Sequence, residues 1–228
     1  MNDFVYMQGR FTPAEEAHLS VKTHAFLYGT SLFEGVRGYW LKDENAVSLF
    51  RLKEHYQRLL ENSRIFFMLP EEEYSKDLPE EWARLTCELV KKNEPKQDFY
   101  IRTSLYKSDS NSIGPCLDNS KTDLMIWTKP LADYVNVKDG LHVTVSSWRR
   151  VDDNAIAPCA KAAGAYMNSA VMVTDAKRRG FDEVIALTSD GRVSEGSAMN
   201  LFMVRKGKLV TPSVTENILE GITRDTVM

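Results

Sequence analysis

Cysteine and histidine are scarce in this chain of 228 residues, which has three of the first and four of the second. Cys87, Cys116 and Cys159 are widely spaced and odd in number, and the histidines form neither an HExxH motif nor a paired-ligand pattern. A disulfide framework needs paired cysteines, and a zinc site needs clustered Cys or His ligands. The sequence therefore predicts ordinary thiols and no metal site.

A long apolar run and an excess of either charge are missing as well. No segment approaches the length of a membrane span, and the N-terminal residues MNDFVYMQGRF lack the basic-then-apolar order of a signal peptide. The formal net charge of -3 gives no indication of a polyanionic partner. We therefore expect a cytoplasmic protein that binds neither a membrane nor a nucleic acid.

What the chain does have is an ordinary globular balance, with 43% hydrophobic and 27% charged residues. Its length allows one large domain or two small ones. Segments rich in β-branched and aromatic residues predict strands in the first half, and apolar residues at helical spacing predict helices between them. The predicted strands lie at 4–13, 46–52, 99–107 and 123–130, and the predicted helices at 52–67 and 78–95. This alternation is typical of an α+β unit.

A polar stretch, LADYVNVKDGLH at 131–142, separates this unit from the rest of the chain. We place the domain boundary there. The predicted organisation is a small N-terminal α+β domain at 1–130, an interdomain loop at 131–137 and a second domain at 138–228.

The second half carries clear turn and helix-end signals. A helix from about Ala165 is predicted to end at AKRRG, with Gly180 as its left-handed cap. Asp190-Gly191 predicts a hairpin turn after the strand EVIAL, and a second turn follows at KGK. GITRD is typical of a loop that enters a helix, with Thr223 as the candidate N-cap.

The segment CAKAAGAYMNS, at 159–169, places Lys161 among small residues just before this helix. A lysine that forms a Schiff base must be deprotonated when it attacks, so it needs a desolvated pocket or a nearby cation that lowers its pKa. The setting of Lys161 has that character. The alternative is a lysine whose stem lies along an apolar surface while its ammonium reaches solvent.

Three other features have two interpretations each when taken alone. Tyr166 is either a half-buried core tyrosine or a neighbour of Lys161 in the same pocket. Glu195 is either a solvated loop charge or a carboxylate that keeps a pyridine nitrogen protonated. The backbone N–H groups of GITRD either form a plain helix start or hold a phosphate.

Taken together, these segments resemble the branched-chain amino acid aminotransferases, which belong to the fold type IV class of pyridoxal-phosphate enzymes. The resemblance covers nearly the whole chain. It is carried by HAFLYGTSLFEGVRGY, RLKEHYQRLLENSRIF, YIR, AKAAGAY, GFDEVIALTSDGRVSEGSAMNLF and LEGITRD, of which the last three are highly specific. It implies a two-domain α+β fold of type IV.

The resemblance also implies the cofactor, pyridoxal 5'-phosphate, and the residues that contact it. Lys161 would be the catalytic residue that forms a Schiff base with the cofactor, Tyr166 would bind its phenolic oxygen, and Glu195 would pair with its ring nitrogen. The phosphate contacts would come from Arg58, Ile222 and Thr223. Helical spacing alone points Arg58 toward solvent, about 200° around the helix from Tyr56, so the resemblance overturns that interpretation.

The substrate pocket implied by the resemblance has mostly apolar walls. Tyr28, Phe33, Gly35 and Tyr100 would line it, and Arg102 would lie near the substrate carboxylate; without the resemblance, core packing accounts for each of them. Apolar walls suit an aliphatic side chain. The implied activity is transfer of the amino group of a branched-chain L-amino acid to a 2-oxo acid such as 2-oxoglutarate, by a homodimer or higher homo-oligomer.

Several alternatives stay open on the sequence. A D-amino acid transaminase of this fold tends to have a His two positions after a basic residue, and YIRTSLY has Ser104 there. An aminodeoxychorismate lyase shares the Lys and Glu but needs a pocket for an aromatic substrate. A transaminase of (R)-amines is the nearest enzyme alternative, and a truncated, non-catalytic dimeric chain is the alternative from another class.

Two departures from the family pattern bear on these expectations. Near the place where the family has a large aromatic residue over the substrate in the interdomain loop, TKPLADY has Leu131, with Tyr134 a little beyond, so the substrate preference stays open. Family members also continue well beyond GITRD and gain further phosphate contacts there. The resemblance therefore implies a second domain that is truncated here, with weak cofactor retention and self-association through an uncovered apolar face.

Overall fold

The computed structural model describes residues 3–69, 73–111, 113–131 and 139–228. The chain forms two compact units, Met1–Ala132 and Asp133–Met228. Of the predicted interdomain loop, only Leu131 is among the described residues, and Tyr134 is outside them.

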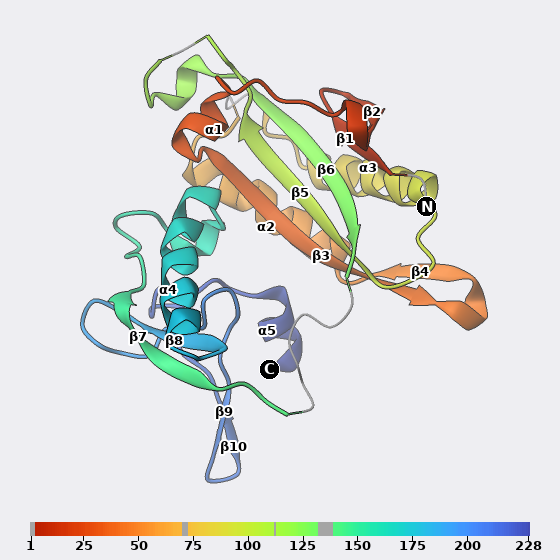
Figure 1. The fold of residues 1–228 in the computed structure, drawn as a ribbon. Coiled ribbons are helices and arrows are strands. Elements are labelled where there is room, and N and C mark those ends of the chain that lie inside the picture. Colours follow the sequence, from red (N-terminus) through yellow and green to blue (C-terminus); the bar gives the residue numbers. More distant parts are fainter. Residues whose placement is uncertain (1–2, 70–72, 112, 132–138) are drawn as a thin grey trace. The chain divides into compact units, whose positions relative to one another are not determined.

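The first unit is built on an antiparallel sheet of six strands in the order β2-β1-β6-β5-β3-β4 (Figure 1). The strands are β1 (Phe4–Met7), β2 (Arg10–Pro13), β3 (Ser31–Leu41), β4 (Ala46–Leu49), β5 (Phe99–Lys107) and β6 (Thr122–Pro130). The predicted strands are confirmed, although β4 stops at Leu49 because the following residues start a helix.

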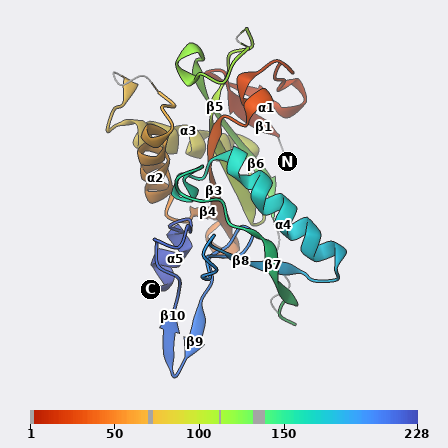
Figure 2. The ribbon, with the colours of Figure 1, turned by 90° about the vertical axis from the view of Figure 1, so that its left-hand side faces the viewer.

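Two amphipathic helices, α2 (Leu52–Ile65) and α3 (Leu78–Asn93), lie on the same side of this sheet (Figure 2). Tyr56 of α2 is fully buried, and its hydroxyl bonds to Thr86 of α3 and, at 2.8 Å, to Thr103 of β5. Asn93 closes the far end of α3, with its side chain bonded to both backbone groups of Phe4. The apolar stripe read from the sequence is therefore the face that packs on the sheet.

The longest strand, β3, has no counterpart among the predicted strands. It contains Gly35 and Gly38, and glycine is unfavourable in strands because it packs no side chain. A Cβ on Gly38 would lie 2.3 Å from the ring of Phe99, and one on Gly35 would lie 2.6 Å from the hydroxyl oxygen of Tyr100. The two glycines are required because aromatic rings of the neighbouring strand β5 lie across them.

Among the described residues of the first unit, the remaining regular elements are short. They are the helix α1 (His24–Tyr28) and the 3-10 helices η1 (Ala14–Glu16), η2 (Lys42–Glu44) and η4 (Leu117–Asn119).

The second unit has a parallel pair of strands, β7 (Val143–Arg149) and β8 (Glu183–Leu187), against which helix α4 (Tyr166–Arg178) packs (Figure 1). Its small core consists of Met172, Ala176, Val184 and Ala186, with Phe181 packed against it. The unit also contains η5 (Pro158–Ala160), η6 (Ala163–Ala165), β9 (Met203–Arg205), β10 (Lys208–Val210) and α5 (Ile222–Val227).

The helix end and the turns of the second unit agree in part with those predicted from the sequence. Gly180 has φ +86 just after α4, and the β9–β10 turn has positive φ at Lys206 and Gly207, as predicted. The turn at Asp190-Gly191 forms, but the strand expected after it is reduced to a single bridge between Leu187 and Val193.

The prediction that Thr223 is the N-cap of the final helix is wrong. The helix α5 begins at Ile222, and its N-cap is Gly221, which has extended backbone angles and no side chain to accept a hydrogen bond from the first turn. Thr223 therefore lies inside the first turn.

Candidate active site

Lys161 sits between two single-turn helices, η5 and η6, and has left-handed backbone angles of φ 50 and ψ 43. A residue with a side chain in this region carries strain of about 1–3 kcal/mol, which the surrounding structure must offset. Its Nζ donates a hydrogen bond to Tyr166 Oη at 3.2 Å. Because Tyr166 is the first residue of α4, the helix start holds the phenol beside the amine. Two of the predicted site residues are thus in direct contact.

Glu195 is buried, with 4% of its side chain exposed, which excludes a solvated loop charge. Its Oε1 lies 2.8 Å from Arg150 Nη2. Its Oε2 accepts bonds from Asn200 Nδ2 at 3.0 Å and from the backbone N–H of Leu219 at 3.1 Å. A buried carboxylate needs such partners, because an unpaired charge away from water is costly.

Burial raises the pKa of Glu195 above its ordinary value, and the guanidinium of Arg150, the backbone N–H of Leu219 and the charge of Lys161 oppose this effect without cancelling it. The carboxyl therefore holds a proton more readily than one in water.

Arg150 is a residue of this site that the sequence did not single out. Its side chain is 5% exposed, and besides Glu195 it contacts Ser169 Oγ of α4 through Nη1 at 3.1 Å and the backbone oxygen of Asn217 at 3.4 Å. In the sequence it stands next to Arg149 in SWRRV, and no motif distinguishes the two. Strand alternation does not separate them either, because the last three residues of β7 are all exposed and Arg150, the first residue after the strand, is buried.

Replacing Arg150 with methionine should lower the free energy of unfolding by about 3–5 kcal/mol, because it leaves the buried Glu195 without its ionic partner. Denaturant unfolding followed by circular dichroism measures this change. The matched control is Arg149→Met, which removes an exposed arginine at the adjacent position. Similar losses in the two variants would contradict a special role for the buried pair.

Asn200 connects Glu195 to the start of α5. Its Nδ2 also donates to the backbone oxygen of Leu219 at 2.8 Å, and a Cβ on Gly221 would lie 2.1 Å from its Oδ1. Glycine is therefore needed at 221, because a larger residue there would overlap the Asn200 amide, which bonds both to the Glu195 carboxylate and to the backbone of Leu219. The predicted phosphate residues Ile222 and Thr223 follow directly in the first turn of α5, the first half-buried and the second exposed.

Arg58 lies on α2, in the first unit, and the prediction from helical spacing that it faces solvent is wrong. Only 11% of its side chain is exposed. Its Nε and Nη2 donate to the two carboxylate oxygens of Glu34 at 2.8 and 2.7 Å. Glu34 is on β3 and points from the sheet toward α2.

The predicted substrate residues lie mostly on the other face of the same strands. Gly35 of β3 is directly opposite Arg102 of β5, and Phe33 lies one pleat repeat from Gly35 on the same face. The guanidinium carbon of Arg102 is 3.3 Å from the centroid of the Phe33 ring, and Arg102 Nη1 is 3.4 Å from Tyr100 Oη. These four residues therefore form one cluster.

Tyr28, the fifth predicted substrate residue, is on α1 and is more exposed than the cluster. Its ring centroid is 4.8 Å from that of His24, which is buried.

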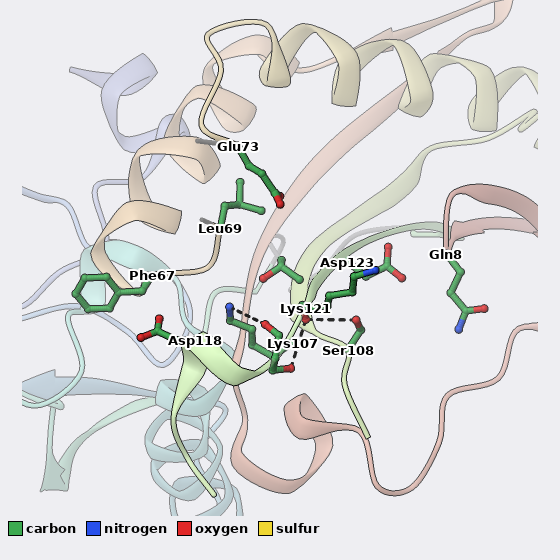
Figure 3. A pocket seen from close by; sticks show the side chains of 11 residues that line it. Gln8, Phe67, Leu69, Glu73, Lys107, Ser108, Asp118, Lys121 and Asp123 are labelled. Carbon is green, nitrogen blue, oxygen red and sulfur yellow. Dashed lines mark hydrogen bonds between the residues drawn. The ribbon is translucent and has the colours of Figure 1, made fainter. Parts of the chain in front are cut away.

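A cavity of about 800 Å³ in the first unit contains none of the predicted site residues (Figure 3). Its floor holds Lys107, a buried lysine whose Nζ donates to the backbone oxygens of Met68 and Ser120 at 3.0 and 3.1 Å. Burial lowers the pKa of Lys107. The ammonium joins the segment after α2 to the residues between η4 and β6, which gives it a structural role.

The described residues show no group of three or more His, Cys, Asp or Glu side chains suited to a metal ion. In the same residues, no helix combines the length and the apolar character that a membrane crossing requires.

Similarity to known proteins agrees with this arrangement. A protein of Aquifex aeolicus (strain VF5), named "Probable branched-chain-amino-acid aminotransferase", is 43% identical over 226 residues, which are 99% of this chain and 71% of that protein. The structure of a branched-chain aminotransferase from Thermoproteus uzoniensis with norvaline has a TM-score of 0.91 and 37% identity, and the match covers 100% of this chain and 73% of that one.

A branched-chain amino acid aminotransferase of Thermobaculum terrenum, solved in its PLP form, has a TM-score of 0.89 and 32% identity over 99% of this chain and 72% of that one. These matches confirm the predicted resemblance and the type IV fold. The amino-transferase class IV family matches residues 31–228 of the sequence. The chain therefore belongs to the class IV aminotransferases.

Proposed function

We propose that this aminotransferase moves the amino group of an aliphatic, branched-chain L-amino acid to a 2-oxo acid such as 2-oxoglutarate, with pyridoxal 5'-phosphate as its cofactor. The names of the relatives support both the reaction and the cofactor. The observation that carries the proposal is the contact of Lys161 Nζ with Tyr166 Oη at 3.2 Å, in the unit that also buries Glu195.

The residues present fit this cofactor group by group. Pyridoxal phosphate has an aldehyde, a phenolic oxygen, a basic ring nitrogen and a phosphate. We assign the amine of Lys161 to the aldehyde, the hydroxyl of Tyr166 to the phenolic oxygen and the buried carboxyl of Glu195 to the ring nitrogen. Arg58 and the turn at Ile222 and Thr223 are assigned to the phosphate. When bound, the cofactor supplies an electron sink for the pair of electrons left on the substrate α-carbon.

Lys161 has two tasks in this proposal. Its Nζ binds the cofactor before the substrate arrives, and once displaced it serves as the general base that takes the proton from the substrate α-carbon. The hydrogen bond with Tyr166 keeps the amine at the place where both tasks are performed. The strained backbone at Lys161 fits a position that is held by its surroundings for chemistry.

Glu195 is proposed to lie against the ring nitrogen as a carboxylate and to keep that nitrogen protonated. Its bonds to Arg150, Asn200 and Leu219 keep the carboxyl from rotating away, and the Arg150 guanidinium favours its charged form against the effect of burial. A negative charge fixed against the nitrogen stabilises the protonated ring and, through it, the transition state of proton removal.

The cluster on the sheet is proposed to select the substrate. The Phe33 ring, Gly35 and the Tyr100 ring give an aliphatic side chain apolar surface, and Tyr28 adds a further aromatic wall. The Arg102 guanidinium supplies a positive charge for the substrate carboxylate. A pocket that binds mainly by apolar area suits branched aliphatic chains.

L-Leucine, L-isoleucine or L-valine should outperform D-alanine as amino donor, because the proposed pocket offers apolar area that the methyl group of alanine cannot use. Steady-state transamination with 2-oxoglutarate as acceptor gives kcat/KM for each donor. An (R)-amine belongs in the same panel as a test of the nearest alternative. A clear preference for D-alanine or for the (R)-amine would overturn the proposed substrate.

We also propose that the chain acts as a homodimer or higher homo-oligomer. In and before α1, apolar side chains that a monomer would leave in water are exposed, with Val21 at 74% and Phe26 at 76%. The cytoplasmic location stays a prediction.

A further inference from the structure

We propose that Glu34 and His55 are positioning residues for Arg58, and that they hold its guanidinium in the orientation in which it binds the phosphate of the cofactor. This inference rests on the proposed function, which assigns Arg58 to the phosphate. It adds two residues that neither the motifs nor the family match assigns.

The geometry of the three side chains carries the inference. Glu34 is wholly buried, and Arg58 meets it through two parallel bonds, Nε to Oε1 at 2.8 Å and Nη2 to Oε2 at 2.7 Å. Two such bonds fix the plane of a guanidinium, which a single bond cannot do. His55 Nδ1 lies 2.7 Å from the same Oε2. His55 and Arg58 are three residues apart on α2, so both side chains reach one carboxylate.

The carboxylate of Glu34 is held in its charged form by these partners. Burial alone would raise its pKa, but the hydrogen bonds from His55 and Arg58 outweigh burial and hold the pKa of Glu34 below its ordinary value. At neutral pH the Arg58 guanidinium therefore lies against a carboxylate that stays ionised. An arginine carries five N–H donors, so it can serve this carboxylate and a second anion at once.

Stability alone gives little reason for such a group in the interior. A buried ion pair is often no more stabilising than apolar residues of similar size, because desolvation of both charges offsets their attraction. Here the pair joins β3 to α2, and the same two elements also carry buried apolar residues such as Val36 and Leu59. Orientation of the Arg58 guanidinium gives a reason for the buried pair that core packing does not give.

Electrostatics and orientation make opposite predictions for removal of the carboxylate charge. Glu34 is negative and lies against Arg58, so its charge by itself weakens the attraction of the arginine for a phosphate. Loss of that charge would then strengthen phosphate binding. If Glu34 instead orients the guanidinium, loss of the Glu34 charge weakens phosphate binding, because the N–H donors of Arg58 are no longer held in one direction.

The test compares pyridoxal 5'-phosphate with pyridoxal, which lacks the phosphate. The full 228-residue chain, freed of cofactor, is titrated with each compound, and dissociation constants are obtained from absorbance. Glu34→Gln should weaken pyridoxal 5'-phosphate by about ten- to a hundred-fold, the range of a charge-assisted hydrogen bond, and leave pyridoxal unchanged. Glu54→Gln is the matched control, since it changes an exposed glutamate on the same helix and should alter neither.

His55→Leu provides a second variant in case Glu34→Gln folds poorly. It removes one bond to Glu34 and keeps the fork with Arg58, so we expect about a fivefold loss that is again confined to the phosphorylated compound. Unchanged or tighter binding of pyridoxal 5'-phosphate by both variants would overturn the inference. Equal weakening of the two compounds would also overturn it, because that result indicates a structural defect.

Arg58→Met separates this inference from the proposed function on which it rests. Methionine keeps an extended side chain but has neither the charge nor an N–H donor. If Arg58→Met leaves the preference for the phosphorylated compound intact, the assignment of Arg58 to the phosphate fails, and the inference fails with it. If Arg58→Met reduces that preference while Glu34→Gln and His55→Leu do not, only the positioning role is lost.

Discussion

Replacement of Lys161 with alanine is expected to reduce transamination by at least about 10⁴-fold, because one side chain supplies both the covalent attachment of the cofactor and the general base. The fold should stay largely intact, because the Lys161 side chain is only half-buried and its loss leaves no cavity in a packed core. Single-turnover kinetics with a branched-chain donor measures the loss, and circular dichroism checks the fold.

Borohydride reduction of the cofactor-loaded protein gives an independent readout of the same assignment. We expect pyridoxal phosphate to become fixed to the peptide that contains Lys161. Lys107 is a demanding internal control, because it is a second buried lysine and burial lowers its pKa, yet its ammonium is bound to two backbone oxygens. Label on Lys107, or on no lysine of loaded protein, would show that Lys161 has been given the wrong role.

Glu195→Gln should lower turnover by about 10²-fold or more, in the range found when a preorganised electrostatic group is removed. Glutamine keeps the size of the side chain and can still accept from Asn200 or Leu219, but it carries no charge to hold a proton on the ring nitrogen. Comparison of kcat for the two proteins at saturating donor and cofactor measures the effect.

Glu216→Gln is a suitable control for this substitution. Glu216 is in the same unit and also pairs with an arginine, Arg192, but at the surface and outside the proposed site. Its turnover should equal that of the unaltered protein. A Glu195→Gln variant with unchanged turnover would mean that Glu195 serves the fold alone, together with Arg150.

Much of the fold could be predicted because its signals are local. The apolar stripes of α2 and α3, the β-branched and aromatic residues of β5 and β6, and the glycine after α4 each act within a few residues of their own position. Where neighbouring strands decide the conformation, the sequence was less informative. The strand β3 has two glycines that lower its own preference, and it forms because β5 and β4 pair with it on both sides.

The site divides in the same way. The sequence by itself determined the family, through motifs that name Lys161, Tyr166 and Glu195, and the Lys161–Tyr166 contact follows from a separation of five residues across a helix start. Only the tertiary structure decided that Arg150 is the buried partner of Glu195 and that Arg58 is held by Glu34. Those partners are tens of residues apart in sequence. Burial and charge pairing depend on which elements pack together, and no local pattern encodes that choice.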